Sequence, residues 1–439
     1  MADVASILQG NPEVGEALMA LFAECGELRA FGARVVEAAM NAAMSAAADE
    51  ACGAAWGQRS GSRVNSRNGY RPRSLKTTFG DLELEVPKLR RGSFFPDGLL
   101  RRYTRVEASL AALVAEMYVA GVSTRSVEGL ALELGVSSLS SSEVSRLASS
   151  IDAQVGEMRA RRLDSQRYCY LWLDATYVRC RCDGRAATRA VVTAIALGAD
   201  GCKHLVGLDL VDTESYADWR TFLAGLKARG LGGLVLVVSD AHAGLVRAVG
   251  EVFQGVPWQR CTVHLQRNVS DAVRRRCNEA LVRELVKAAF AQGDPLVARA
   301  LYDEAASAVR AAGEAAAADL LESAREDALQ YLSAPRSHWV RLRTNNVQER
   351  TNREFKRRYR TVQCFPSEAS LVRLLGAVAL EEDDRWQQRR VFSPGSTAEA
   401  WAPREAPAPD AALAREIAEA GRRAREICAS IVDRFGAKE

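Results

Sequence analysis

The chain has 439 residues, of which 48% are hydrophobic and 26% are charged, and its formal net charge is +4. These values are ordinary for a soluble globular protein of roughly two to four domains, and they do not by themselves indicate a nucleic-acid partner. No apolar signal segment opens the sequence and no stretch is long enough to cross a bilayer, so we expect a cytoplasmic protein.

The ten cysteines form no paired framework, and Cys180 and Cys182 are the only close pair. The sequence contains no Cys-x-x-Cys and only four histidines. This usage favours reduced thiols in packed positions and argues against a structural zinc site.

The first hundred residues change from helix-forming to basic. Residues 1–55 are rich in alanine and predict helices, which serve either as a dimerisation segment or as an N-terminal helical layer. In residues 56–106, Leu82, Leu84 and Val86 alternate with acidic residues, and the preceding Gly80-Asp81 predicts the turn of a β-hairpin.

The hairpin segment is also a candidate DNA-binding surface. From Arg59 to Arg105 it contains twelve Lys and Arg residues against four Asp and Glu, with aromatic residues interleaved. Such a segment favours contacts with a DNA backbone, the alternative being a solvated basic surface. The candidate contacts are Arg67, Arg71, Arg73, Lys76, Lys88, Arg90 and Arg91.

Residues 107–160 predict three short helices with Ser/Thr caps, in the rhythm of a helix-turn-helix domain. The candidate recognition helix presents Ser142, Ser145 and Arg146, which is a polar but weakly basic face. Many three-helix units bind no nucleic acid, so Arg146 is a candidate DNA contact and a packing role for the unit stays open.

From residue 161 the pattern is that of an α/β protein. Three strands are followed by a helix, a strand ending at Asp240, a second helix and a last strand over 258–265. This is the order of a ribonuclease H-like core interrupted by a large α-helical insertion. The predicted parts are the first part of the core at 161–265, the insertion at 266–335, the last part of the core at 336–390, and a linker with a helical tail at 391–439.

Three carboxylates follow from this order. Asp174 interrupts an apolar strand, where a charge is costly, and Asp240 ends a neighbouring strand. Two adjacent anions need a cation between them, and Mg²⁺ or Mn²⁺ prefers oxygen ligands. Glu349, on a helix after the insertion, supplies the third carboxylate, with Glu354 ranked second. We therefore predict a site for two metal ions that performs in-line displacement at phosphorus.

The helix that carries Glu349 is strongly basic. Residues 353, 356, 357 and 360 fall on the same helical face as Glu349. A cationic helix beside a scissile phosphate holds the nucleic-acid backbone. The candidate DNA contacts on this helix are Arg350, Arg353, Lys356, Arg357 and Arg360.

Five segments in this order resemble the Mutator-type transposases of bacterial insertion sequences, relatives of the plant Mutator element. The resemblance covers roughly residues 60–385. The segments are SRNGYRPRSLKTTFGDLELEVPKLRRGSFFP, YLWLDATYVR with Asp174, VVSDAHAGLVRAV with Asp240, CTVHLQRNV with Cys261 and His264, and RTNNVQERTNREFKRRYRTVQCFPSEAS with Asn346 and Glu349.

The resemblance implies a DDE transposase whose catalytic and metal-binding residues are Asp174, Asp240 and Glu349. It also implies binding of terminal inverted repeats, metal-dependent strand cleavage and strand transfer, a homodimer or higher homo-oligomer, and a place on the nucleoid. Cys261, His264 and Asn346 are expected to support the site, although packing alone stays open for the first two. The alternatives are another ribonuclease H-like nuclease and a catalytically silent DNA-binding repressor.

Overall fold

The computed structural model describes residues 11–96, 99–100, 106–133, 135–136, 139–360, 362, 364–403 and 410–436. The chain divides into two compact units, Met1–Asp152 and Ala153–Glu439, each with its own core. Residues 1–10 of the expected N-terminal helices, residues 101–105 of the basic segment and residues 404–409 of the linker lie outside the described residues.

The first unit begins with two helices and the expected hairpin. Its strands are antiparallel, with Thr77 opposite Gly80 at the turn. Leu82, Leu84 and Val86 are fully buried in a cluster with Met44, so the alternation correctly predicted the strand and its buried face. The elements are α2 (Pro12–Cys25), α3 (Leu28–Cys52), β1 (Arg67–Thr77) and β2 (Gly80–Leu89).

Three short helices complete this unit, as their caps predict. Leu110, Val114 and Val144 are buried in their common core. Ser140 begins the third helix with a capping box in which its hydroxyl accepts from the Glu143 amide. The side chain of Ser145 lies outside the described residues. The elements are α4 (Ala108–Val119), α5 (Thr124–Glu133), α6 (Ser141–Leu147) and η1 (Ala148–Ser150).

The second unit is built on a mixed five-stranded sheet with the strand order β5-β4-β3-β6-β7. The first three strands in the chain pair antiparallel, and the last two run parallel to the central strand. The last strand is shorter than the expected 258–265, because a helix begins at Thr262. The strands are β3 (Tyr168–Cys182), β4 (Arg185–Gly198), β5 (Lys203–Val211), β6 (Leu236–Ser239) and β7 (Trp258–Arg260).

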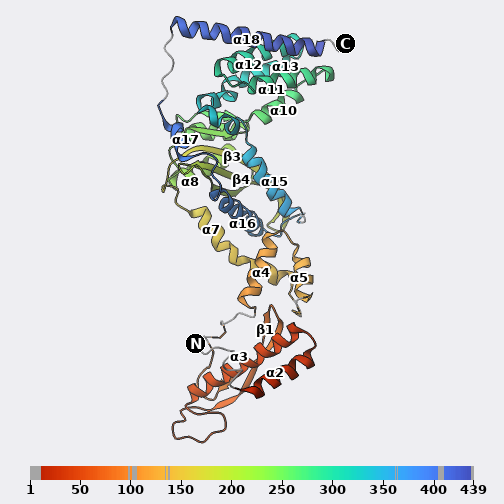
Figure 1. Cartoon of the computed structure of the whole chain (residues 1–439), viewed down its shortest axis with the longest axis vertical. Helices are drawn as coiled ribbons and strands as arrows, with labels where there is room; N and C mark the ends of the chain where they lie inside the picture. Colours follow the sequence, from red (N-terminus) through yellow and green to blue (C-terminus); the bar gives the residue numbers. More distant parts are fainter. Residues whose placement is uncertain are drawn as a thin grey trace. The chain divides into compact units, whose positions relative to one another are not determined.

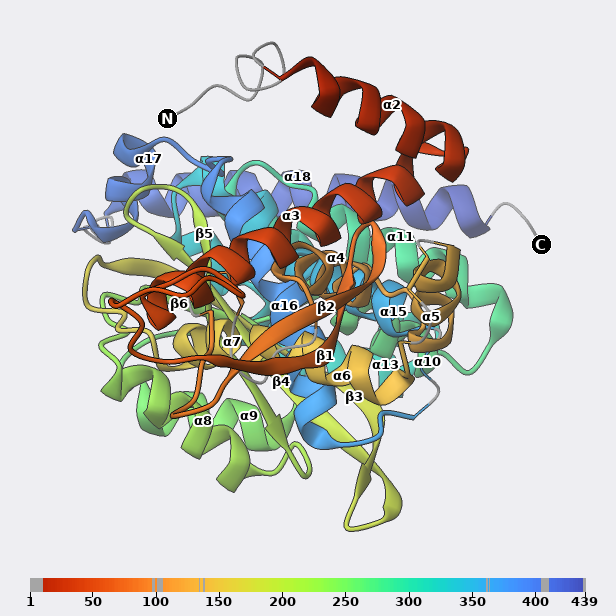
Figure 2. The same cartoon turned by 90° about the horizontal axis from the view of Figure 1, so that it is seen from below.

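Helices cover both faces of this sheet. Leu171 and Leu173 of β3 pack with α8 (Tyr216–Ala228) and α9 (Ala243–Val252), which lie side by side (Figure 2). Tyr170 and Trp172 point to the opposite face, toward the helices of the insertion. Because side chains alternate along a strand, Asp174 belongs to this second face.

The insertion is helical, as expected. Asp294 caps one of its helices by accepting from the amides of Leu296 and Val297, with Pro295 at the first position. The C-terminal helix α18 packs against α12 (Figure 1). The elements here are α10 (Thr262–Asp271), η2 (Arg276–Asn278), α11 (Glu279–Phe290), α12 (Pro295–Ala311), α13 (Ala315–Ala328), η3 (Gln330–Ser333), η4 (Arg336–His338), α14 (Trp339–Leu342) and α18 (Ala411–Gly436).

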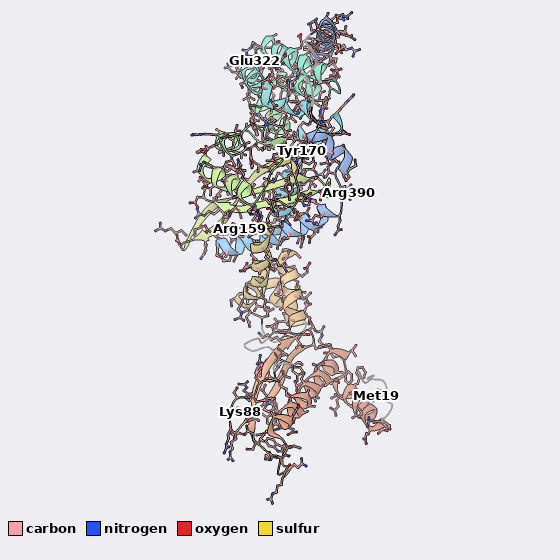
Figure 3. The ribbon with its side chains drawn as sticks, turned by 90° about the vertical axis from the view of Figure 1, so that its left-hand side faces the viewer. Met19, Lys88, Arg159, Tyr170, Glu322 and Arg390 are labelled. Atoms are coloured by element: carbon pink, nitrogen blue, oxygen red, sulfur yellow. The ribbon has the colours of Figure 1, made fainter. Side chains whose placement is uncertain are left out.

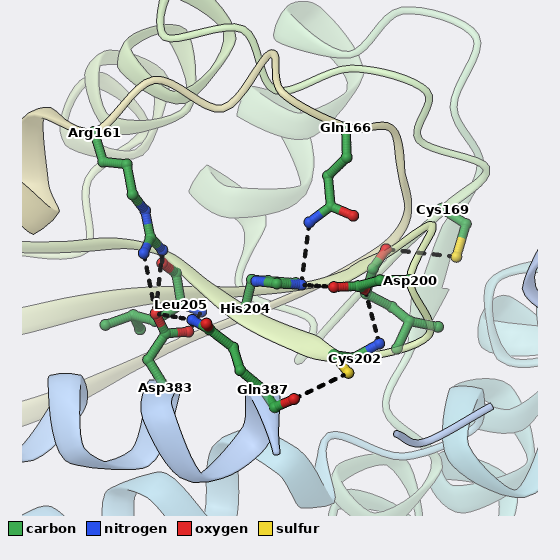
Figure 4. Close-up of polar contacts among 10 residues, drawn as sticks. Arg161, Gln166, Cys169, Asp200, Cys202, His204, Leu205, Asp383 and Gln387 are labelled. Atoms are coloured by element: carbon green, nitrogen blue, oxygen red, sulfur yellow. Dashed lines mark hydrogen bonds and ion pairs between the residues drawn. The ribbon is translucent and has the colours of Figure 1, made fainter. Parts of the chain in front are cut away.

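A polar network fastens the long helix α16 to the edge strand β5 (Figure 4). Asp383, almost fully buried, accepts from the Leu205 amide at 2.6 Å and pairs with Arg161 at 3.2 Å. Because both oxygens have partners, this buried charge stabilises the docking of α16. The remaining elements are α7 (Ile151–Ala160), α15 (Asn346–Tyr359), α16 (Glu368–Gln387), α17 (Pro394–Ala398) and η5 (Glu399–Trp401). None of the helices among the described residues has the length and apolar character needed to span a membrane.

Gly201, in the turn between β4 and β5, generates a stability prediction. Its φ is +80°, and a Cβ there would overlap the carbonyl oxygen of Phe392. We expect Gly201→Ala to lower the free energy of unfolding by about 2 kcal/mol or more, measured by denaturant titration. Gly395→Ala, whose Cβ meets no atom within 4 Å, is the matched control. Equal stabilities of the two variants would contradict the predicted clash.

Candidate active site

Asp174 lies in the middle of β3, half-buried, with one carboxylate oxygen bound. The Asn352 side chain donates its amide N–H to Oδ2 of Asp174 at 2.7 Å. Burial, together with the charges of Asp240, Glu214 and Glu349, raises the pKa of Asp174 to about 7, against a lowering backbone hydrogen bond. Four carboxylates therefore share one electrostatic environment at this point of the sheet.

Asp240 directly follows β6, the parallel neighbour of β3. Trp172 pairs with Val238 at the end of this register, and Asp174 and Asp240 each follow two residues further along their chains. The fully buried Ser239 fixes this strand end, because its hydroxyl donates to the Asp240 carbonyl at 2.8 Å and accepts from the Trp258 indole at 2.9 Å.

Glu349 lies in the first turn of α15, which is tied to the backbone of β3 just before Asp174. The Asn345 side chain donates to the Leu173 carbonyl at 2.9 Å, and Gln348 donates to the Trp172 carbonyl at 2.8 Å. The Glu349 amide in turn donates to the Asn345 carbonyl at 3.1 Å. Two side-chain amides thus bring the third predicted carboxylate to the other two. Asn346 is exposed at the first position of the helix.

Cys261 links the strand end to the helix that carries Glu349. Its amide donates to the Ser239 carbonyl at 2.8 Å, and its thiol accepts from the Asn345 amide at 3.2 Å. Burial raises the pKa of this thiol, and its hydrogen bond holds the sulfur at the junction of β6 and α15. His264, one turn into α10, is half-buried, and its Nδ1 has no hydrogen-bond partner among the described residues.

The basic side chains of α15 divide into two groups. Arg357 and Arg358 both donate to Glu354, Arg357 at 2.6 Å and Arg358 at 2.9 Å, and Arg358 also binds Glu381 of α16 at 2.8 Å. Glu354 and Arg357 are therefore engaged in an ion-pair network that joins α15 to α16. The other predicted cations of the helix are exposed, namely Arg350, Arg353, Lys356 and Arg360.

The predicted cations of the hairpin also divide. The side chain of Arg67 is only 2% exposed, pairs with Asp49 at 2.5 Å and lies over the ring of Trp56. Arg67 therefore packs inside this unit and is not part of the candidate DNA-binding surface. Lys76 pairs with Glu143 at 3.4 Å, and Arg73 lies over the Phe95 ring. Figure 3 labels Lys88 among the side chains that project from the first unit. The exposed predicted cations of this unit are Arg71, Lys88, Arg90, Arg91 and Arg146.

The donor set fits a hard divalent cation. Within the described part of the chain, no ion pair forms at the carboxylates of Asp174, Asp240 or Glu349. Anions that converge without a protein cation are stable together when a metal ion binds them, and carboxylate oxygens suit Mg²⁺. Sequence reasoning missed Glu214 and Asn352; Asn352, three residues after Glu349 on one helix, had a spacing that could have revealed it.

The network around Glu354 generates a pH prediction. The hydrogen bonds from Arg357 and then Arg358 lower the pKa of Glu354 from 4.5 to about 2. A carboxyl group with a depressed pKa adds stability above its unfolded pKa and loses it as the pH falls toward its folded pKa. We expect Glu354→Gln to lower the free energy of unfolding at pH 7 by about 1 kcal/mol after solvent screening, with the difference narrowing below about pH 4.5. The exposed Glu416→Gln is the control, and a pH-independent difference for Glu354→Gln would contradict the pairing.

Comparison with known proteins identifies the family of the chain. The model of the family described as "Transposase, Mutator family" matches residues 22–389. The transposase of insertion sequence IS1081 from Mycobacterium tuberculosis is 40% identical over 326 residues, 74% of this chain and 78% of the relative. That of IS256 in transposon Tn4001 from Staphylococcus aureus is 39% identical over 321 residues, 73% and 82% of the two chains. A solved structure titled "Drosophila P element transposase strand transfer complex" aligns over 70% of this chain and 84% of its own at 13% identity, but its TM-score of 0.27 supports no conclusion about the fold. By its family match and these identities, the chain belongs to the Mutator family of transposases.

Proposed function

We propose that Asp174, Asp240 and Glu349 are the catalytic triad with which this transposase cleaves and joins DNA strands. The observation that carries the proposal is the attachment of α15 to β3, where Asn345 and Gln348 donate to the Leu173 and Trp172 carbonyls just before Asp174. This attachment brings Glu349 near Asp174, and the raised pKa of Asp174, with Asp240 and Glu349 among its causes, agrees with it. The absence of ion pairs at these three groups, within the described residues, supports a role in binding metal rather than in stability.

We also propose that the sheet is a ribonuclease H-like core. Its three antiparallel strands followed by two parallel ones, in the order β5-β4-β3-β6-β7, support this assignment. Asp174 on the central strand and Asp240 on its parallel neighbour then occupy adjacent strands of the core, and the insertion separates them from Glu349.

The residues of the chain prepare this site for phosphoryl transfer. When bound, two Mg²⁺ or Mn²⁺ ions would activate the attacking oxygen and stabilise the leaving oxygen at phosphorus. Asn352 holds one oxygen of Asp174 and leaves the other available. Cys261 and Asn345 keep the end of β6 and the start of α15 together, so the three carboxylates stay in register. Asn346 and His264 are proposed to support the site from its edge, with His264 near the DNA.

Exposed cations supply the proposed DNA contacts. On α15 they follow Glu349 along the helix, where they would hold the backbone beside the scissile phosphate. In the first unit they cluster on the hairpin. We propose the terminal inverted repeats of the element as the specific DNA, and a homodimer or higher homo-oligomer that handles two ends on the nucleoid. The proposed contacts are Arg71, Lys88, Arg90, Arg91, Arg146, Arg350, Arg353, Lys356 and Arg360.

Substitution of the triad tests the proposal. We expect Asp174→Asn, Asp240→Asn and Glu349→Gln each to lower strand cleavage by about a thousandfold or more, because each removes a carboxylate from the metal site. The measurement is nicking of a labelled duplex that carries the element's own end, with Mg²⁺ or with EDTA. DNA affinity, measured by gel shift, should stay within about threefold of the wild type.

Glu354→Gln is the matched control, because it removes from the same helix a carboxylate that binds Arg357 and Arg358 instead. It should cleave at the wild-type rate. Loss of DNA binding in all three triad variants would show that these carboxylates are structural. Binding by the wild type without nicking in any metal would indicate a silent DNA-binding repressor, and nicking without end specificity or strand transfer a different nuclease.

The hairpin surface has its own test. We expect Arg71→Ala combined with Arg90→Ala to weaken binding of the same duplex and to reduce the slope of log affinity against log salt by about 2, one for each lost phosphate contact. Arg283→Ala with Lys287→Ala on α11, both also exposed, is the charge-matched control. An unchanged slope in the hairpin variant would remove this surface from the DNA interface.

A further inference from the structure

Cys180, Cys182 and Glu368 form a cluster that the proposed triad does not use. The sulfur atoms of the two cysteines are 3.6 Å apart, and the Cys182 sulfur is 3.1 Å from Oε1 of Glu368. The possible ligand atoms of these three side chains all lie within 4.8 Å of one another. Among the described residues, no other group of three or more His, Cys, Asp or Glu side chains does so. Cys180 is buried, whereas Cys182 and Glu368 reach the solvent.

The backbone, and not the cluster itself, brings the three side chains together. Cys180 and Cys182 are two residues apart on β3, and side chains at this spacing point to the same face of a strand. Phe365, in the connection between α15 and α16, pairs with this strand end, because its amide and carbonyl bond Arg179 and Arg181 at 2.9 Å. Ser367 then caps α16, which places Glu368 at its first position, over the cysteines.

We propose that these three side chains bind a zinc ion. A tetrahedral zinc with Zn–S bonds of about 2.3 Å separates two sulfur ligands by about 3.8 Å, and a sulfur from an oxygen ligand by about 3.5 Å. The measured separations of 3.6 Å and 3.1 Å are within a few tenths of an ångström of these values. A water molecule would supply the fourth ligand.

The charges of the surrounding residues agree with this ligand set. Two thiolates and one carboxylate carry one more negative charge than Zn²⁺ neutralises. Arg189 brings a positive charge to Glu368, since its Nε donates to this carboxylate at 2.8 Å, and the same guanidinium also pairs with Asp212. Such outer partners orient metal ligands and commonly tune metal affinity.

The ligand chemistry separates this site from the triad. Thiolates select zinc over Mg²⁺, whereas the three triad carboxylates favour the harder ion. Cys180 is six residues along β3 from Asp174, about 20 Å in an extended strand. The zinc would fasten β3 to the connection between α15 and α16, and so help to hold the helix that bears Glu349. This assignment revises the expectation that the chain has no structural zinc site.

Cobalt substitution gives the decisive test, because thiolate ligands produce a charge-transfer absorption that carboxylates do not. We expect the reduced full-length protein to bind one Co²⁺ with this absorption and to lose it when Zn²⁺ is added. Cys182→Ser should abolish the absorption, Glu368→Gln should weaken binding, and Arg189→Ala should weaken it by about 10- to 100-fold. Cys277→Ser, at an exposed cysteine outside the cluster, is the control and should behave as the wild type.

Circular dichroism of each variant shows whether it is folded, and Glu368→Gln keeps the test valid if the cysteine variant is not. A wild-type protein without thiolate absorption, or with absorption that Cys182→Ser leaves intact, would overturn the zinc site. The zinc site would also be overturned if the protein took up no cobalt and its mass, measured after treatment with a reductant, stayed two hydrogens below the value expected from the sequence. That mass would assign the two cysteines to a disulfide.

Discussion

The cost of a carboxylate within a packed sheet governs the second unit. Asp174 interrupts a strand whose preceding residues are buried, and its burial together with the neighbouring anions raises its pKa to about 7. An uncompensated group of this kind destabilises a fold, and a bound divalent cation offsets that cost. Asn345 and Gln348 therefore use their hydrogen bonds to hold the backbone around a site that is unfavourable without its ligand.

The hydrogen bonds around Asp174 also explain how α15 is positioned precisely against β3, although a helix cannot pair with a strand by a regular backbone ladder. The side-chain amides of Asn345 and Gln348 donate to carbonyls of β3, and the Gln348 amide oxygen also accepts from the Thr193 hydroxyl of β4 at 2.9 Å. Backbone carbonyls of a central strand are among the most fixed atoms of a fold, so a helix anchored on them inherits their positions. Glu349 therefore has a more precise position on α15 than it would have on a loop.

Local patterns predicted much of this structure. The alternation around Leu84 gave the hairpin, and the Asp294-Pro295 pair gave a helix start in the insertion. Tertiary contacts were not predictable in the same way. Arg67 looks like any surface cation in the sequence, yet Asp49 holds it inside the first unit. The strand expected over 258–265 ends at Arg260 because α10 begins at Thr262, and the bond of the Cys261 thiol to the distant Asn345 amide at this point is a contact that no local pattern encodes.

The bonds at Cys261 have a consequence for the segment that they enclose. The chain leaves the sheet at Cys261 and returns at Asn345, and these residues touch although 84 positions separate them. The bond between Cys261 and Asn345 joins the two ends of this loop. The entropic cost of closing the loop grows only slowly with its length. The helices between the two residues form a segment whose two ends are held at fixed positions. Evolution can lengthen, shorten or replace such a segment without moving the carboxylates beneath it.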